Sequence, residues 1–187
     1  MKLHIVAGSP NGRKVQAVVV ALNLDVELNM MQMRDGEHKQ PEYLKHNPNG
    51  LAPLLIDGDF SLWESNAIMQ YLAAGSALYP NDARAQADIN RWLFWESCHY
   101  GRALSSLLWE NFAKPMFTDE APDEAVVEKA LVQFRQSAQV LNDHLTNRNF
   151  VIGDTATIAD FSLGCHAAYL EQGKAPMGEF PALAAWY

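Results

Sequence analysis

The chain has few cysteines, no basic cluster and no long apolar segment. Only two of its 187 residues are cysteines, Cys98 and Cys165, which is too few for a disulfide scaffold and favours a cytoplasmic location. Acidic residues outnumber basic ones, 22 against 14, so the formal net charge is −8 and nucleic acid is disfavoured as a partner. No stretch approaches the roughly 20 apolar residues that cross a membrane, so no membrane partner is expected, and residues 1–6 do not form a signal peptide.

The remaining composition is that of a protein with substantial hydrophobic cores. Hydrophobic residues make up 49% of the chain, which is enough for one large domain or two small ones. Over residues 1–74 the pattern predicts a strand, a helix, a second strand, a hairpin and a final helix. The three elements expected before the hairpin are a strand over residues 2–7, a helix over residues 13–24 and a strand over residues 26–33.

The pattern changes after residue 74. Residues 75–82 contain glycine, proline and asparagine and form the best linker in the chain. Beyond them, residues 85–111 and 123–147 carry apolar side chains at helical spacing. We therefore expect residues 83–187 to form an all-helical domain.

The end of the chain carries a helix-start signal and a helical pattern. Thr157 and Asp160 fit a capping box in which Asp replaces the usual Glu or Gln. Because the chain stops at Tyr187 within a further helical pattern, we expect that the helical domain is truncated at its end.

The most informative stretch is a hairpin that leads into a helix at an acid–hydroxyl pair. Residues 54–56 form a short apolar strand, residues 57–59 a turn and residues 60–62 the returning strand. Glu64 and Ser65 then open a helix, whose first backbone N–H groups and positive dipole end attract anions. The hydroxyl and N–H groups suit a carboxylate and Glu64 suits an ammonium, so this helix start is predicted to bind one end of a zwitterionic ligand.

Pro53 stands at the entrance to the first strand of this hairpin. Proline gives no N–H to a strand ladder, so it belongs at a strand's first residue or at an edge. If the bond before Pro53 is cis, Ala52 turns its backbone N–H and C=O groups toward a ligand. Cis bonds make up only about 5–6% of bonds before proline, so the sequence leaves the isomer open.

Residues 47–68 form one specific combination. They contain Asn47-Pro48-Asn49-Gly50-Leu51-Ala52-Pro53, then Asp57-Gly58-Asp59, then Glu64-Ser65-Asn66-Ala67-Ile68. This combination resembles the glutathione transferase family, and the resemblance covers essentially the whole chain. It implies an N-terminal α/β thioredoxin-like domain (residues 1–74) followed by an all-α helical-bundle domain (residues 83–187).

The resemblance also implies a function. A cytoplasmic, homodimeric detoxification enzyme would bind glutathione as co-substrate, without a cofactor or a metal, and transfer it to a hydrophobic electrophile. In the family, the cis-proline loop and the Glu/Gln-Ser pair contact glutathione, which assigns Ala52, Pro53, Glu64 and Ser65 to the binding site.

The loop Ser9-Pro10-Asn11-Gly12 follows the first expected strand, where a thioredoxin or glutaredoxin carries Cys-x-x-Cys. Because this loop has no thiol, the reactive sulfur must arrive with the ligand. A serine hydroxyl at a helix start would favour the thiolate form. Lowering a thiol pKa by about two units requires about 2.7 kcal/mol, which one charge-assisted hydrogen bond of roughly 1.5–3 kcal/mol can supply.

Two residues of this loop compete for the contact with sulfur. Ser9 matches the catalytic serine of serine-type, phi/theta-like transferases, and we favour it. Asn11 is the alternative, because Ser-Pro-Asn-Gly is similar to bacterial and fungal relatives in which the asparagine contacts the sulfur and disulfide reduction is favoured. A purely structural cap or turn role for Ser9 also remains open.

The polar loop after the second expected strand contains Gly36-Glu37-His38-Lys39. In plant phi-type transferases such a string provides a His-Lys pair for the glycine carboxylate of glutathione, and His38 and Lys39 match it. A solvated polar loop is the alternative. The family's glutamine two residues before the cis-proline is Leu51 here, so one side-chain contact is missing and weaker glutathione binding is expected.

The pocket for the electrophile is expected against the long aromatic helix after the linker. Its candidate residues are Trp92, Trp95, His99, Arg102 and Trp109. His99 and Arg102 lie one helical turn apart and suit a polar acceptor, although core or dimer-interface roles are an alternative for the whole set. Cys98 and Cys165 are expected to be buried apolar side chains.

Three functions remain open. The favoured one is conjugation of glutathione, and glutathione-dependent reduction of peroxides or disulfides is a close enzymatic alternative. A non-catalytic glutathione-fold binding protein is the alternative from another class. The joint presence of Ser9, Glu64 and Ser65 favours an enzyme.

Overall fold

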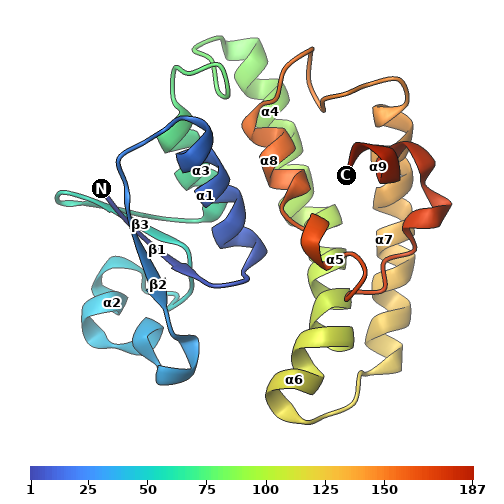
Figure 1. Cartoon of the computed structure of the whole chain (residues 1–187), viewed down its shortest axis with the longest axis horizontal. Coiled ribbons are helices and arrows are strands. Elements are labelled where there is room, and N and C mark those ends of the chain that lie inside the picture. Colours follow the sequence, from blue (N-terminus) through green and yellow to red (C-terminus); the bar gives the residue numbers. More distant parts are fainter. The chain divides into compact units, whose positions relative to one another are not determined.

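The computed structural model describes all 187 residues of the chain (Figure 1). The chain divides into two compact units, Met1–Ala85 and Gln86–Tyr187. None of its helices combines the length and the apolar character that a bilayer crossing requires.

A four-stranded mixed sheet forms the centre of the first unit. Its strands are β1 (Lys2–Val6), β2 (Glu27–Met31), β3 (Leu54–Asp57) and β4 (Phe60–Trp63). They lie in the order β2-β1-β3-β4. β1 pairs in parallel with β2 and antiparallel with β3, and β3 and β4 form the expected hairpin.

Helices cover both faces of this sheet, as the alternation of side chains along β1 shows. The helical segments are α1 (Pro10–Ala21), η1 (Met33–Asp35), η2 (Glu37–Lys39), α2 (Pro41–His46) and α3 (Ser65–Ala73). Ile5 lies against Gly12 of α1, and α1 packs beside α3 (Figure 1). His4 contacts the ring of Tyr43 in α2 edge-on, with 5.8 Å between ring centroids. Because neighbouring side chains on a strand point to opposite faces, α1 and α3 cover one face and α2 the other.

α1 begins three residues before the predicted start. Ser9 is its N-cap, and its Oγ accepts a hydrogen bond from the Gly12 N–H at 3.4 Å. Pro10 is the first helical residue, a position where its fixed φ angle suits the helix and its missing N–H is not needed. The sequence pattern placed the start later because it followed only the apolar positions.

The second unit contains one long run of consecutive helical segments. They are α4 (Ala83–Trp95), which begins at the end of the first unit, η3 (Glu96–Tyr100), α5 (Gly101–Leu108), η4 (Trp109–Ala113) and α6 (Lys114–Thr118). η3 and η4 are wider π-helical turns. Helix over residues 85–111 is thus confirmed, but the two π-helical turns were not predicted from apolar spacing.

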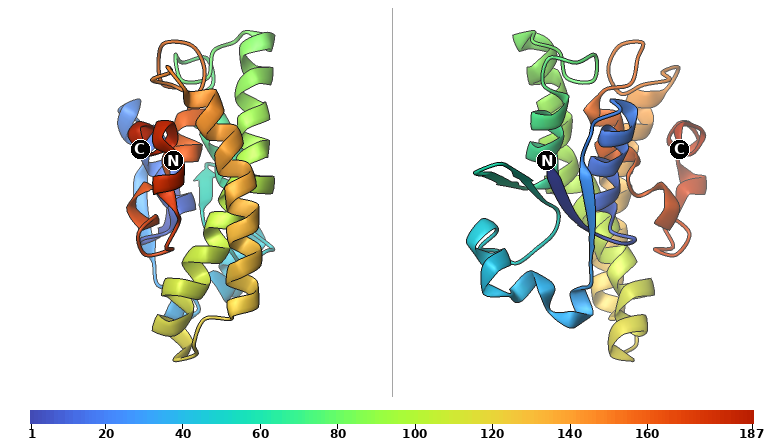
Figure 2. Two further views of the ribbon diagram at one scale, coloured as in Figure 1. Left: turned by 90° about the vertical axis from the view of Figure 1, so that its right-hand side faces the viewer. Right: turned by 60° about the vertical axis from the view of Figure 1, so that its left-hand side comes forward.

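A second long helix lies beside α5 (Figure 2). It is α7 (Glu124–Leu145), and the chain continues through α8 (Ile158–Gly164), η5 (Ala167–Tyr169), η6 (Met177–Glu179) and α9 (Pro181–Trp186). Phe134, Ala138 and Leu141 of α7 are fully buried, so the predicted apolar face of this helix is confirmed.

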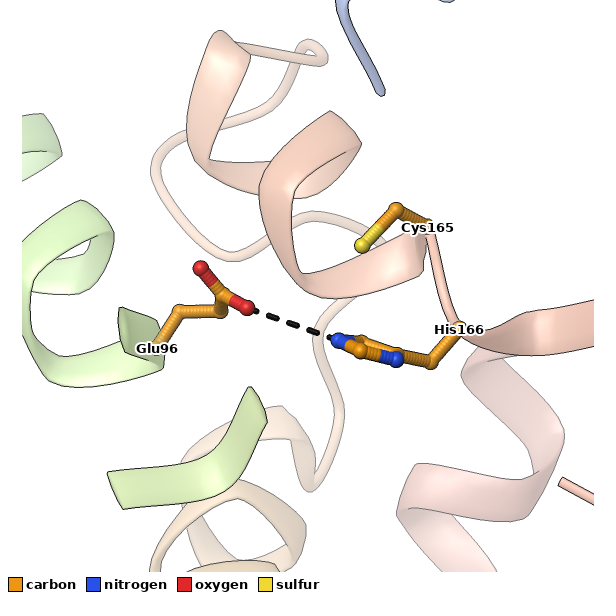
Figure 3. Close-up of side chains that lie close together, drawn as sticks. All are labelled: Glu96, Cys165 and His166. Atoms are coloured by element: carbon orange, nitrogen blue, oxygen red, sulfur yellow. Dashed lines mark hydrogen bonds and ion pairs between the residues drawn. The ribbon is translucent and has the colours of Figure 1, made fainter. Parts of the chain in front are cut away.

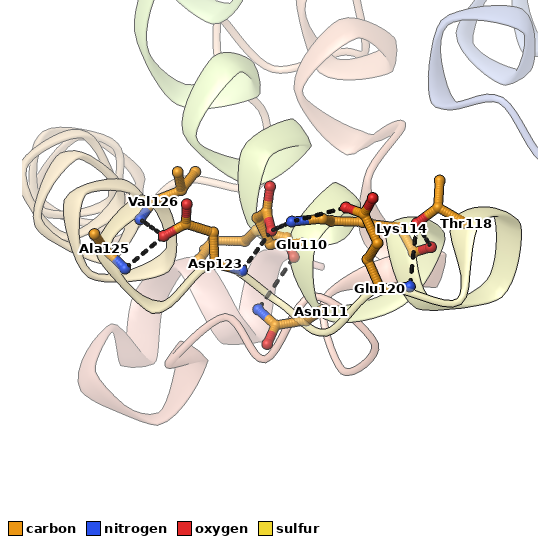
Figure 4. Close-up of polar contacts among 9 residues, drawn as sticks. Glu110, Asn111, Lys114, Thr118, Glu120, Asp123, Ala125 and Val126 are labelled. Atoms are coloured by element: carbon orange, nitrogen blue, oxygen red, sulfur yellow. Dashed lines mark hydrogen bonds and ion pairs between the residues drawn. The ribbon is translucent and has the colours of Figure 1, made fainter.

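Buried Glu110 fixes the turn from α6 to α7 (Figure 4). Its Oε2 accepts hydrogen bonds from Lys114 Nζ at 3.2 Å and from the Asp123 N–H at 2.8 Å. Asp123 in turn caps α7 by accepting from the N–H groups of Ala125 and Val126. The carboxylate therefore joins η4 and the start of α6 to the start of α7.

The predicted capping box at the start of α8 is confirmed. Asp160 Oδ2 accepts from the Thr157 N–H at 2.8 Å, and Thr157 Oγ1 accepts from the Ala159 N–H at 3.3 Å. Asp160 Oδ1 also accepts from the Val151 N–H at 2.8 Å. One aspartate thus satisfies the helix start and holds the loop that precedes it.

Candidate functional site

A small cleft in the first unit gathers several of the residues that sequence analysis selected. Its volume is about 100 Å³. Loop and helix-start residues line it: Asn11, Asn47, Asn49, Leu51, Ala52, Pro53, Trp63, Glu64 and Ser65. Asn11 comes from the start of α1, and the others come from the loop before β3 and from the junction between β4 and α3.

The β4–α3 junction places Glu64 and Ser65 at the N-terminus of α3. Glu64 is the N-cap residue of α3 at φ 74°, and its exposed side chain makes no capping hydrogen bond. A positive φ is strained for a residue with a Cβ, and such strain is concentrated at functional sites. The Glu64 carboxylate is therefore held outside the helix, next to the first N–H groups of α3.

Ser65 connects this junction to the start of α1. Its side chain is buried, and its Oγ donates a hydrogen bond to Asn11 Oδ1 at 3.3 Å. The Nδ2 group of Asn11 then remains as a donor, while its oxygen acts as the acceptor. This contact joins residues that are 54 positions apart in the sequence.

Ser9 is not among the residues that line the cleft. Its hydroxyl oxygen accepts the capping hydrogen bond from Gly12, which is the structural role left open by the sequence. The hydroxyl proton can still be donated, because a serine hydroxyl accepts and donates at once.

The loop before β3 is held by side chains on its carbonyl groups. The Ala52–Pro53 peptide bond is cis, which resolves the isomer that the sequence left open. The Leu51 carbonyl accepts hydrogen bonds from Tyr43 Oη at 2.6 Å and from Asn47 Nδ2 at 2.7 Å. Burial raises the pKa of Tyr43, so its hydroxyl keeps the proton that it donates.

Sequence analysis missed Tyr43 and Asn47 as supports of this loop. Asn47 belongs to the stretch that carries the family resemblance, but nothing in the pattern indicated its hydrogen bond. Tyr43 lies outside every motif that the sequence pattern singled out. Its hydroxyl could have been noticed as a polar group on a position that packs against the sheet.

His38 and Lys39 do not line this cleft. They lie in η2, where Lys39 Nζ donates a hydrogen bond to the Gly50 carbonyl at 3.2 Å. His38 Nδ1 is buried without a hydrogen-bond partner. The lysine therefore contacts the loop that carries Ala52 and Pro53.

Only some of the residues predicted to contact the electrophile lie together in the second unit. His99 and Arg102 line a groove of about 390 Å³ between η3–α5 and α7, together with Trp95 and Cys98. Trp109 is half exposed and lies outside that groove. Trp92 is buried and packs against His144 with 4.5 Å between ring centroids, so it is a core residue.

The two cysteines differ in exposure. Cys165 is buried as expected, but Cys98 is exposed, so the prediction of a buried Cys98 was wrong. The expectation rested on the general tendency of free cysteine to be buried, whereas Cys98 lines the open groove between η3–α5 and α7.

Both units are similar to known protein families. Residues 1–74 match the family described as "Glutathione S-transferase, N-terminal domain", and residues 124–187 match "Glutathione S-transferase, C-terminal domain". Glutathione S-transferase 3 of Zea mays is 38% identical over 165 residues, which cover 86% of this chain and 73% of the relative. A glutathione S-transferase of Hyoscyamus muticus is 33% identical and covers 100% of this chain and 91% of the relative.

Solved structures share the whole arrangement of secondary structure. A glutathione S-transferase-I bound to lactoylglutathione is 28% identical, with a TM-score of 0.86 over 99% of this chain and 90% of that chain. A glutathione transferase from Phanerochaete chrysosporium, solved with oxidized glutathione, is 31% identical, with a TM-score of 0.85 over 99% of this chain and 87% of that chain. The N-terminal α/β thioredoxin-like arrangement and the helical second part are therefore confirmed.

Proposed function

The chain belongs to the glutathione S-transferase family and is an enzyme of that family; from this premise we propose that the cleft of the first unit binds glutathione. The bound thiolate would attack a hydrophobic electrophile and displace a leaving group or add to an activated double bond. No cofactor takes part in this proposal, because glutathione itself supplies the nucleophile.

The observation that carries this proposal is the Glu64–Ser65 junction beside the cis-proline loop. The γ-glutamyl end of glutathione is zwitterionic. Its carboxylate would accept from the first N–H groups of α3, which favour anions. It would also accept from Ser65 Oγ, whose single proton would then turn from Asn11 Oδ1 to the ligand. Its ammonium would pair with the exposed Glu64 carboxylate, and the Ala52 backbone beside Pro53 would contact the middle of the tripeptide.

Asn11 and Ser9 are the two groups proposed to stabilise the thiolate. The position of Asn11 in the cleft, with Nδ2 available to donate, supports the amide as the contact to sulfur. Ser9, which sequence analysis favoured, is supported by its place at the N-terminus of α1 and by its remaining hydroxyl proton. Each group would supply one hydrogen bond to a charged sulfur, at roughly 1.5–3 kcal/mol.

His38 and Lys39 are proposed for the glycine carboxylate of glutathione. Lys39 already donates to the Gly50 carbonyl, but an ammonium carries three donors, so it can hold the loop and a carboxylate together. Leu51 offers no polar side chain at the family's glutamine position. This absence supports the expectation of weaker binding.

For the electrophile we propose only which side chains it contacts. His99 and Arg102 line one groove and are proposed to meet a polar part of the electrophile, and Trp109 an apolar part. We also propose a cytoplasmic homodimer, which the family membership and the presence of only two cysteines support.

Disulfide or peroxide reduction with glutathione is the second candidate function. It is favoured by the Asn11 amide in the cleft and by the similarity to a transferase solved with oxidized glutathione. Assays with an aryl halide and with a mixed glutathione disulfide separate the two functions. Faster thiol transfer than conjugation would make reduction the main activity.

Calorimetric titration with glutathione tests the binding site directly. Ser65→Ala should weaken binding by about 1–3 kcal/mol, because it removes the buried hydroxyl that would donate to the ligand carboxylate. Ser105→Ala is the matched control, since Ser105 is exposed on α5. Equal affinities of the Ser65→Ala variant and the unaltered protein would overturn the assignment of the cleft.

A further inference from the structure

A carboxylate, a thiol and an imidazole, all of which can bind metals, lie close together inside the second unit (Figure 3). Glu96 is the first residue of η3, and Cys165 and His166 follow the end of α8. All three are buried, with relative exposures of 3%, 3% and 4%. One ligand atom from each lies within 4.8 Å of the other two. A carboxylate, a thiol and an imidazole are thus gathered in one sealed place by segments that lie about 70 residues apart.

The distance between two of these groups suits ligands of a shared ion. Glu96 Oε1 and His166 Nε2 are 3.5 Å apart. Charge-assisted N–H···O hydrogen bonds are shorter, at about 2.7–2.9 Å. In a tetrahedral zinc site with ligand bonds of about 2.0–2.2 Å, neighbouring oxygen and nitrogen ligands lie about 3.3–3.6 Å apart. The pair is therefore a long hydrogen bond in this structure, and its spacing also suits two ligands of the same metal.

Surrounding residues orient the Glu96 carboxylate. Ser162 Oγ donates a hydrogen bond to Glu96 Oε2 at 3.1 Å, so the other oxygen, Oε1, faces His166. Hydrogen bonds of this kind, made to a ligand by a residue that does not touch the metal, are typical of metal sites.

The backbone also makes room for this carboxylate. A Cβ at Gly101 would lie 2.0 Å from Glu96 Oε1, so glycine is required there. Glu96 also begins a π-helical turn, a feature that is frequent at functional sites.

We propose that Glu96, Cys165 and His166 bind a divalent zinc ion that stabilises the second unit. A thiolate and an imidazole select zinc or its substitute cobalt over magnesium or calcium. A thiolate, a carboxylate and a neutral imidazole around one divalent cation sum to zero charge, which suits a sealed interior. The three side chains leave the fourth tetrahedral position to a ligand from outside the protein, and a sealed site of this kind takes up its ion during folding. The site is independent of glutathione binding.

The competing explanation is an internal ion pair between Glu96 and His166 with Cys165 as a thiol. Under that explanation the protein takes up no metal at this place. Cobalt distinguishes the two, because a thiolate bound to tetrahedral cobalt gives a ligand-to-metal charge-transfer band and intense visible bands.

The experiment uses the full chain. It is unfolded with denaturant, chelator and reductant, refolded with cobalt chloride, and then desalted and measured for cobalt content and absorbance. We expect equimolar cobalt and the charge-transfer band. Cobalt far below equimolar, or equimolar cobalt without that band, would overturn the proposal, whatever the outcome of the glutathione titrations.

Variants assign the ligands. Cys165→Ala and His166→Gln should lose the charge-transfer band, whereas Cys98→Ala, which removes the only other thiol, should keep it. Ser162→Ala retains all three ligands and should bind cobalt about 10- to 100-fold more weakly, which provides a readout if the ligand variants fail to fold. Retention of the band in Cys165→Ala, or its loss in Cys98→Ala, would place the metal elsewhere.

Discussion

The cleft of the first unit and the Glu96 cluster of the second unit differ in how their polar groups are exposed to water. In the cleft, Glu64 is exposed on a strained backbone and Asn11 Nδ2 remains available as a donor, so these polar groups are open to solvent. In the cluster, Glu96, Cys165 and His166 are sealed from water, so their polar groups must be compensated inside the protein. The cleft is therefore accessible from solvent, whereas the cluster is a permanent part of the packed interior.

This contrast predicts that changes at the cluster alter stability and changes at the cleft alter binding. Gly101→Ala should have the largest effect. The added Cβ would lie 2.0 Å from Glu96 Oε1 and 3.1 Å from the Glu96 carbonyl oxygen. Overpacking costs about 1–3 kcal/mol and occasionally more, and so close a contact places this variant at or above the upper end of that range. Denaturant unfolding of the full chain measures this loss.

Gly164→Ala is the control for that variant. Gly164 also lies in a helix of the second unit, but the nearest atom to its added Cβ is 3.7 Å away, an ordinary contact. Because Gly164 is the last residue of α8, alanine should gain no more than the roughly 0.5–1 kcal/mol that it gains in the middle of a helix. If both variants changed stability equally, the tight fit around Glu96 would be refuted.

Removal of the group that stabilises the thiolate should have the next largest effect. The variant that lacks the true sulfur contact, Asn11→Ala or Ser9→Gly, should raise the thiol pKa of bound glutathione by about two units, equivalent to about 2.7 kcal/mol. Glycine is chosen at position 9 because it preserves an N-cap to within a few tenths of a kcal/mol. Ultraviolet titration of the bound thiolate gives the answer. An unchanged pKa in both variants would exclude both residues from this role.

Glu64 provides a test in which stability and binding move in opposite directions. Glu64→Gly should remove the backbone strain of φ 74° and so raise the free energy of unfolding by about 1 kcal/mol. It should also weaken glutathione binding by about 1.5–3 kcal/mol, since a charged partner is lost. Glu64→Ala should weaken binding equally without the gain in stability. A Glu64→Gly variant with normal affinity would show that the carboxylate does not contact glutathione.

Tyr43→Phe should have the smallest effect. It removes one of the two hydrogen bonds on the Leu51 carbonyl and leaves the one from Asn47, at a cost of about 1 kcal/mol. KM for glutathione should rise while kcat changes little, because the loop binds the ligand and does not contact sulfur. A fall in kcat alone would contradict this assignment.

Residues close in the sequence explain why much of the fold could be predicted. The β3–β4 hairpin, the start of α3 at Glu64 and Ser65, and the capping box of α8 each depend on residues within one turn of one another. Such contacts are encoded by spacing and turn chemistry. The helix start that was misplaced, at Pro10, depends on the Ser9 cap and a proline and not on apolar periodicity.

By itself, the sequence determined the two-part architecture and the acid–hydroxyl pair at the start of α3, because hydrophobic period and local capping act over a few residues. Only the tertiary structure decided that Asn11 meets Ser65, that Cys98 is exposed, and that Glu96 lies beside Cys165 and His166. Packing brings these distant segments together, and a π-helical turn or a close glycine contact leaves no periodic signal in the sequence. The sequence therefore shows the residues of the buried cluster but could not predict that they lie close together.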